Sequence, residues 1–270
     1  WPEPVKLLAA DGHTDLYGLV FRPTDFSPDQ QYPVLNYIVS APWLSVVPKG
    51  SFHNCRGYAN RHYFYGAALA ELGFIVVLID SRGTPLRSKA FQDESYGWIP
   101  AAANQDDHSS ALQQLAARYP YMNMNKVGVF TPNGYRSGLH NFLERQDIYS
   151  VCVVINLMDN RLISGAIEGD KYEGCEGPAA DRRYPEQLVE NLQGKLLLMH
   201  PTSSMVSVFY PPAATFRVIE ALQKANKDFD MLVVPSLCTG YLMRRAWDYL
   251  VEHLQDREPP TAFELGEVSL

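Results

Sequence analysis

The chain has 270 residues, of which 46% are apolar and 20% are charged, and its formal net charge at pH 7 is -7. These values are typical of a globular protein that is long enough to bury one large core. The acidic balance, without any cluster of Lys and Arg, argues against a nucleic-acid-binding protein, and no apolar run is long enough to span a membrane.

Short apolar runs rich in Val, Ile and Leu recur along the chain and predict strands. Apolar and polar residues do not alternate in most of these runs, which is the pattern of strands that are buried on both faces. The predicted strands are Leu16–Phe21, Val34–Ile38, Ile75–Ile79, Val127–Phe130, Val151–Ile155, Leu196–Met199 and Met231–Val234.

Segments with a helical spacing of apolar residues lie between the predicted strands. Tyr63–Leu72 ends at Gly73, a favourable C-terminal cap, and Gln105–Arg118 stops just short of a proline. The alternation of strands and helices predicts an α/β fold, with a mostly parallel central sheet of about eight strands and helices on both faces. The first strand and its neighbour are expected to form an antiparallel edge. The other predicted helices are Tyr135–Arg145, Pro212–Ala225 and Tyr241–Leu254.

One domain is expected over residues 1–255, followed by a polar tail over residues 256–270 that is expected to fray. The opening residues Trp1-Pro2-Glu3-Pro4 do not form a signal peptide, and so abrupt a start indicates a domain from a longer precursor or a mature fragment. Glu168–Pro185, with its glycines and charged residues, is the expected long excursion between elements.

The cysteines give no sign of a metal site, because none of them forms a C-x-x-C pair. Cys152 lies in an apolar run and is interpreted as a small buried hydrophobe, while a disulfide elsewhere stays open. His53, Cys55 and His62 could be drawn as metal ligands, but their spacing fits no common site, so no metal and no cofactor is expected. The four cysteines are Cys55, Cys152, Cys175 and Cys238.

The segment V-G-V-F-T-P-N-G-Y-R-S, residues 127–137, has the layout of a strand-turn-helix that carries a catalytic nucleophile. Such a turn normally reads G-x-S-x-G, with the serine at its tip. Here Asn133 occupies the tip, and Thr131 and Tyr135 occupy the flanking glycine positions. Because asparagine tolerates positive φ, the turn can keep its shape, but an amide cannot be activated by a base as a hydroxyl can.

Further segments follow in an order and spacing that resemble the catalytic domain of the prolyl oligopeptidase family, in its dipeptidyl-peptidase-IV-like branch. Asp80-Ser81-Arg82-Gly83-Thr84 is similar to the family's D-x-R-G-[ST] segment. The resemblance runs nearly end to end and implies an α/β-hydrolase fold. The other matching segments are Trp1–Pro4, Tyr32–Leu35, Gln114–Pro120, Ala225–Met231 and Arg244–Tyr249.

The resemblance implies four functional positions, and this chain departs from the family at each of them. The nucleophilic serine corresponds to Asn133, and the triad aspartate, in a segment similar to H-G-x-x-D, corresponds to Ser204. The triad histidine corresponds to Thr239, and the oxyanion tyrosine corresponds to Val39. The substrate-pocket stretch is altered too, with Ile163, Ser164, Ile167 and Glu168 where the family carries aromatic residues.

These replacements remove every part of the acyl-transfer mechanism. Thr239 does not ionise near pH 7 and cannot act as the base, Ser204 has no charge to orient one, and Val39 has no donor for an oxyanion. Losing one oxyanion donor alone costs roughly 3–4 kcal/mol. Several independent replacements are typical of relaxed selection rather than of a single engineered substitution.

Other isolated polar residues are interpreted as structural. Ser137, one turn past Asn133, is expected to be a buried or capping serine, and His200 a hydrogen-bonded histidine at a strand end. Cys238 has no partner base in its sequence neighbourhood. Asp106-Asp107-His108 at the start of a helix is interpreted as a set of charges that the helix dipole favours.

The leading hypothesis is a catalytically inactive, prolyl-oligopeptidase-like domain that acts by binding or assembly. Because catalytic domains of this family often dimerise through the last helix and a neighbouring strand, the resemblance implies a homodimer through Tyr241–Leu254, with Leu242, Trp247, Leu250 and Val251 at the contact. The alternative is a serine-type peptidase, dipeptidyl-peptidase-like, that remains active on peptides. A third hypothesis is a module that binds a peptide or small molecule between Asn133, Ser204 and Thr239.

Overall fold

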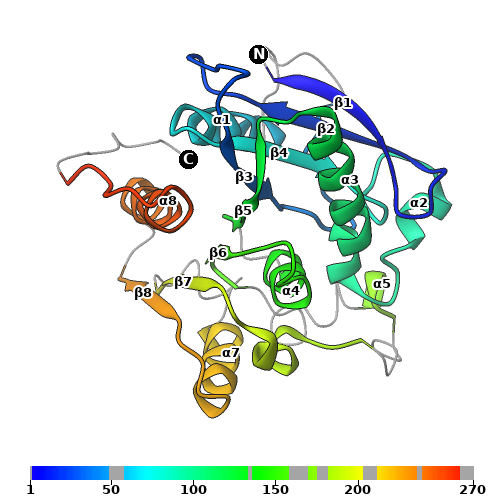
Figure 1. Cartoon of the computed structure of the whole chain (residues 1–270). Coiled ribbons are helices and arrows are strands. Elements are labelled where there is room, and N and C mark those ends of the chain that lie inside the picture. Colours follow the sequence, from blue (N-terminus) through cyan, green and yellow to red (C-terminus); the bar gives the residue numbers. More distant parts are fainter. Residues whose placement is uncertain are drawn as a thin grey trace.

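The computed structural model describes residues 2–48, 58–132, 136–157, 170–174, 182–202, 212–235 and 239–261, with only the backbone described at 58–61, 170 and 239. Within these residues, one eight-stranded sheet forms the centre of the molecule, in the order β1-β2-β4-β3-β5-β6-β7-β8 (Figure 1). The strands are β1 (Glu3–Leu8), β2 (Asp15–Phe21), β3 (Tyr32–Tyr37), β4 (Ile75–Asp80), β5 (Met122–Thr131), β6 (Val151–Ile155), β7 (Lys195–Pro201) and β8 (Asp230–Val234).

The sheet is parallel from β4 to β8, and β1 and β2 form an antiparallel edge. The predicted mostly parallel sheet with an antiparallel edge is therefore confirmed. The outermost strand, β1, was not among the predicted runs. Its Val5 and Leu7 are buried while Lys6 and Leu8 are exposed, so it alternates as an edge strand does and offers no continuous apolar run.

Among the described residues, three longer helices cover one face of the sheet and two cover the other (Figure 1). α3 (Gln105–Arg118), α4 (Arg136–Glu144) and α7 (Pro212–Lys224) pack on one face, and α1 (Tyr58–Glu71) and α8 (Thr239–Gln255) pack on the other. All five correspond to predicted helices. The short elements were not predicted, and they are α2 (Lys89–Asp93), η1 (Ile99–Ala103), α5 (Asp170–Tyr172), η3 (Pro185–Gln187) and η4 (Val189–Asn191).

The central strands are buried on both faces, which explains why their sequences do not alternate. In β6, Val151, Val153 and Ile155 belong to the apolar cluster beneath α1 and α8. Cys152 and Val154 belong to the cluster beneath α3, α4 and α7. Cys152 is fully buried, which confirms its interpretation as a core residue, and burial raises the pKa of its thiol.

The apolar face of α8 packs against the domain itself. Leu242, Trp247, Leu250 and Val251 all lie in the cluster beneath α1 and α8, and none of them is more than 8% exposed. The expectation that these four residues form a dimer contact is therefore wrong, because their side chains are already covered by the sheet.

The described part of the tail, residues 256–261, follows the end of α8 without helical structure and contacts the domain. Asp256 forms an ion pair with Lys126 at 2.7 Å, and the carbonyl oxygen of Thr261 accepts a hydrogen bond from Arg244 at 3.2 Å. In the parts of the chain that the structure describes, no helix combines the length and the apolar character that crossing a membrane requires.

Candidate functional site

Three of the four positions implied by the family follow the carboxyl ends of parallel strands. Asn133 follows β5, Ser204 follows β7, and Thr239 follows β8 as the first residue of α8. Parallel strands end at the same edge of a sheet, where ligand sites of α/β folds form. Asn133 and Ser204 lie outside the described residues, as does the side chain of Thr239. The described carboxyl ends of β5, β7 and β8, which precede these positions in the chain, therefore lie at one edge of the sheet.

Val39, the fourth position, lies just past the end of β3 and is fully buried. Its side chain belongs to the apolar cluster beneath α1 and α8. An aliphatic side chain that points into a core cannot donate a hydrogen bond to an oxyanion. The burial of Val39 in this cluster is consistent with the predicted loss of the donor.

Thr131 is the last residue of β5 and packs against α4. In the sequence it corresponds to the first glycine of the G-x-S-x-G pattern. Thr131 is fully buried, and its Oγ1 has no hydrogen-bond partner among the described atoms. A Cβ atom added to Gly138 on α4 would lie 1.8 Å from this oxygen. The glycine that permits close contact therefore lies on the helix in this chain, while the strand carries the larger side chain.

Ser137 and His200 are structural, as predicted. Ser137 is 1% exposed, and its Oγ donates a hydrogen bond to the carbonyl oxygen of Ser40 at 3.4 Å. His200 is also 1% exposed, lies 3.4 Å from the hydroxyl of Thr215, and has its pKa lowered by burial. Cys238 and the altered pocket residues Ile163, Ser164, Ile167 and Glu168 lie outside the described residues.

Of the three residues that could be drawn as a metal site, only His62 is described. It is fully buried, and its Nδ1 lies 2.7 Å from the hydroxyl of Tyr37. Among the residues with described positions, no group of three or more His, Cys, Asp or Glu side chains is arranged to hold a metal.

A buried arginine, Arg136, is the first residue of α4. Arg136 is 5% exposed, its Nη2 lies 3.8 Å from Oε1 of Glu173, and its guanidinium stacks 4.8 Å from the ring centre of Tyr184. The pair joins residues 170–174 to the start of α4. Sequence reasoning missed it, although a charged residue on the inner side of a predicted buried helix is a signal for such a pair.

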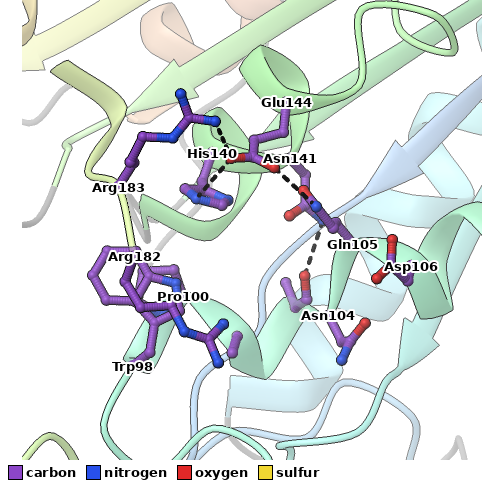
Figure 2. Close-up of a pocket in the computed structure, with 12 residues that line it drawn as sticks. Trp98, Pro100, Asn104, Gln105, Asp106, His140, Asn141, Glu144, Arg182 and Arg183 are labelled. Atoms are coloured by element: carbon purple, nitrogen blue, oxygen red, sulfur yellow. Dashed lines mark hydrogen bonds and ion pairs between the residues drawn. The ribbon is translucent and has the colours of Figure 1, made fainter. Parts of the chain in front are cut away.

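Beside α4 lies a polar cavity of about 180 Å³ (Figure 2). Glu144 is central to one wall, where it accepts a hydrogen bond from Gln105 at 2.9 Å and lies 3.7 Å from Arg183 and 3.9 Å from His140. Burial lowers the pKa of His140 to about 4, so its ring is neutral at pH 7. The wall also includes Trp98, Pro100, Ala101, Ala103, Asn104, Asp106, Asn141 and Arg182.

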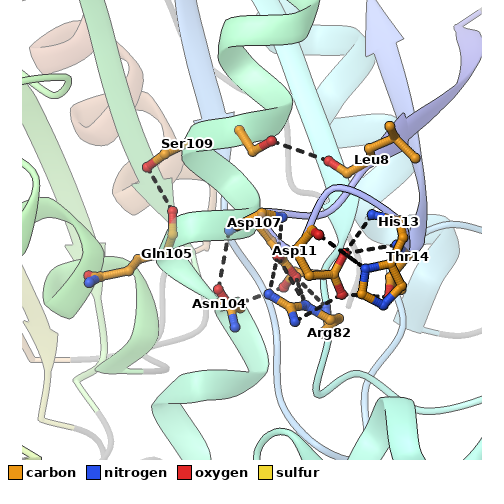
Figure 3. A network of polar contacts seen from close by, with 12 residues as sticks. Leu8, Asp11, His13, Thr14, Arg82, Asn104, Gln105, Asp107 and Ser109 are labelled. Carbon is orange, nitrogen blue, oxygen red and sulfur yellow. Dashed lines mark hydrogen bonds and ion pairs between the residues drawn. The ribbon is translucent and has the colours of Figure 1, made fainter.

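The residues Asp106-Asp107-His108 do not act as one set of helix-dipole charges. Asp106 is exposed, but Asp107 is fully buried and accepts hydrogen bonds from the guanidinium of Arg82 (Figure 3). The backbone N–H of Ala10 also donates to Asp107, at 3.0 Å, and Arg82 contacts Asp11 at 3.2 Å. This network joins the β1–β2 hairpin, the segment after β4 and the start of α3.

His108 belongs to a second, fully buried polar chain. Its Nδ1 lies 3.1 Å from Oδ1 of Asn36, whose Nδ2 donates to the hydroxyl of Tyr149 at 2.7 Å. Asn36 and His108 are completely shielded from solvent, and Tyr149 is 2% exposed. Burial lowers the pKa of His108 to about 4, which keeps the ring neutral and leaves it a donor to Asn36.

We expect stability to fall on acidification from pH 6.5 to pH 4.5. In the unfolded chain His108 and His140 take up protons near pH 6.5, whereas in the folded protein they do so only near pH 4. Protons therefore bind the unfolded state more strongly in this window, and each histidine lowers the free energy of unfolding by roughly 1.4 kcal/mol per pH unit.

The measurement is urea unfolding at a series of pH values, for the natural chain and for His108→Gln, which keeps a donor towards Asn36. The variant should lose about half of the slope. His13→Gln is the matched control because this ring is 80% exposed, and it should keep the full slope. A His108→Gln profile as steep as that of the natural chain would contradict the assignment.

Comparison with known proteins gives sequence relatives for part of the chain and structural relatives for most of it. No family model matches the chain. Over 154 residues, or 56% of its length, the chain is 32% identical to human dipeptidyl peptidase 8, of which it spans only 16%. The mouse protein of the same name is 31% identical over 154 residues.

Two solved bacterial structures share the fold. One is a Bacteroides ovatus protein assigned as a dipeptidyl aminopeptidase IV, with a TM-score of 0.76 and 22% identity, covering 94% of this chain and 36% of that chain. The other is Porphyromonas gingivalis dipeptidyl peptidase 4, with a TM-score of 0.73 and 20% identity, covering 94% of this chain and 35% of that chain.

The fold, the order of the sequence segments and the sequence match with dipeptidyl peptidase 8 agree with one another. The eight-stranded sheet has helices on both faces, and the positions of the family's functional residues follow its strands. The chain has an α/β-hydrolase fold, and over 56% of its length its sequence is similar to that of a dipeptidyl peptidase, of which it spans 16%.

Proposed function

We propose that this domain is a catalytically inactive member of the prolyl oligopeptidase family that acts by binding or assembly. The observation that carries the proposal is the chemistry of four positions, where an amide, two neutral hydroxyls and an aliphatic group replace the nucleophile, the acid, the base and the oxyanion donor. The buried, core-facing side chain of Val39 supports it.

Two ionisable side chains at the carboxyl ends of described strands, His200 and Asp80, have hydrogen-bond partners of their own. His200 is buried beside Thr215, on the side of the sheet covered by α7. The carboxylate of Asp80, at the end of β4, accepts hydrogen bonds from the hydroxyl of Ser45 at 2.5 Å and the backbone N–H of Val46 at 2.8 Å. These contacts support a structural role for both side chains.

The alternative, an active serine-type peptidase, is favoured by the names of the relatives. A Xaa-Pro dipeptide reporter separates the two functions, with an active dipeptidyl peptidase assayed in parallel as the positive control. We expect the chain to release no reporter above the buffer rate, because losing the nucleophile or the base costs several powers of ten in rate. Turnover that co-purifies with the chain and is blocked by a serine-directed inhibitor would refute the proposal.

Assembly would use the outer edge of β8 and the exposed start of α8. Val233 on β8 is 48% exposed and Tyr241 on α8 is 45% exposed, and β8 is the last strand of the sheet. We expect a homodimer by light scattering, and Val233→Lys should shift it towards monomer because a charge on this edge opposes strand pairing.

The matched control for this prediction is Leu86→Lys. Leu86 is 70% exposed and follows β4, away from β8 in the sheet, so a lysine there should leave the dimer intact. Light scattering that shows only monomer for the natural chain would exclude assembly through this edge.

A further inference from the structure

The polar cavity beside α4 is separate from the positions that follow β5, β7 and β8. Its described walls come from η1, the start of α3, the middle of α4 and the two arginines before η3. None of these residues occupies a family catalytic position. Ligand binding at this cavity does not depend on the proposed loss of catalysis.

Two side-chain amides line this cavity, and one of them has a buried oxygen that accepts no hydrogen bond from any described group. Asn141 is 1% exposed, its Nδ2 donates to the carbonyl oxygen of Ala103 at 3.0 Å, and its side chain faces the cavity in Figure 2. Oε1 of Gln105 is buried and has no partner in the described part of the chain, while its Nε2 donates to Glu144. The buried Oε1 of Gln105 calls for a donor, which a ligand in the cavity can supply.

The charges at the cavity favour a ligand that carries both signs. The Glu144 carboxylate lies beside the two acceptors through its hydrogen bond with Gln105, and His140 next to it is neutral at pH 7. Arg182 faces the cavity from the opposite side in Figure 2 and forms no ion pair with any described residue. Acceptors and a carboxylate suit an ammonium group, and a guanidinium suits a carboxylate.

The size and the remaining walls restrict the ligand further. A volume of about 180 Å³ is smaller than the roughly 300–1,000 Å³ of cavities that hold drug-sized ligands. It suits one amino acid and leaves no room for a longer peptide. Trp98 and Pro100 supply an apolar surface on the same side as Arg182.

We propose that this cavity binds a free α-amino acid in its zwitterionic form. The ammonium group donates to Oδ1 of Asn141 and Oε1 of Gln105, next to the carboxylate of Glu144. The ligand's carboxylate pairs with Arg182, and its side chain lies along Trp98 and Pro100. No covalent chemistry takes place.

Isothermal titration calorimetry on the full chain tests the ligand class. The probes are glycine, L-leucine, L-glutamine and L-lysine, each also as its N-acetyl derivative and its amide, together with the dipeptide Gly-Leu. At least one free amino acid should bind, and its N-acetyl derivative and its amide should each bind about tenfold more weakly or worse, because each loses a charge-assisted hydrogen bond. No binding of any free amino acid up to about 10 mM, or equal binding of N-acetyl forms or of Gly-Leu, would overturn the proposal.

Variants test the two ends of the ligand separately. Arg182 is exposed, and Arg182→Ala should weaken the binding of the free amino acid about tenfold. The binding of its amide should stay unchanged. Gln105→Met should weaken the binding of both the free amino acid and its amide. Arg118→Ala removes the same charge from the far end of α3 and is the matched control, which should bind like the natural chain. An equal effect of Arg182→Ala and Arg118→Ala would refute the assigned carboxylate contact.

Discussion

Replacing Asp107 by alanine is expected to destabilise the domain by about 3–5 kcal/mol, the range for removing one partner of a buried ion pair. Asp107 is fully buried, and its carboxylate receives Nη2 of Arg82 at 2.8 Å and the backbone N–H of Arg82 at 3.0 Å (Figure 3). Its loss leaves a largely buried guanidinium without its main partner and also leaves the N–H of Ala10 without its acceptor.

Urea unfolding measures this loss, and the neighbouring Asp106→Ala is the matched control. Asp106 is exposed, so its removal should change the free energy of unfolding by no more than about 0.5 kcal/mol. Arg82 would keep only Asp11, a contact of 3.2 Å at the surface side of the network. If Asp107→Ala were as stable as Asp106→Ala, the network would not hold the hairpin, β4 and α3 together.

Replacing Gly138 by alanine is expected to cost about 3 kcal/mol, at the upper end of the usual range for overpacking. The added Cβ would lie 1.8 Å from Oγ1 and 3.0 Å from Cβ of Thr131, so α4 or the end of β5 must move. Both residues are buried, and the close-packed interior leaves little room for such a shift.

A double-mutant cycle separates this clash from a general effect on α4. Thr131→Gly should recover most of the stability that Gly138→Ala loses, giving a coupling of roughly 2 kcal/mol between the two sites. Simple additivity of the two changes would contradict direct contact.

The sequence anticipated the sheet well because its central strands are buried on both faces. Val151–Ile155 and Gln105–Arg118 have the same bounds in the structure as in the prediction, since continuous apolar runs and a helical period are strong local signals. β1 (Glu3–Leu8) was not predicted because an edge strand buries only every second side chain. Its pairing with β2 is a tertiary property.

The candidate site was anticipated in part. The family spacing implied that Asn133, Ser204 and Thr239 follow three parallel strands, and β5, β7 and β8 precede these positions in the chain. The partners of Asp107 were not foreseen, because Arg82 lies in a different element and nothing local identifies it. The cavity acceptor Asn141 was not foreseen either, because an asparagine inside an amphipathic helix gives no sign of which wall it faces.

Intact-protein mass spectrometry after incubation with a fluorophosphonate tests the central claim most directly. The account predicts an unchanged mass, with an active dipeptidyl peptidase fully labelled under the same conditions, because no activated hydroxyl remains to attack phosphorus. A stoichiometric mass increase that maps to a side chain at the carboxyl edge of β5, β7 or β8 would show a working nucleophile and contradict it.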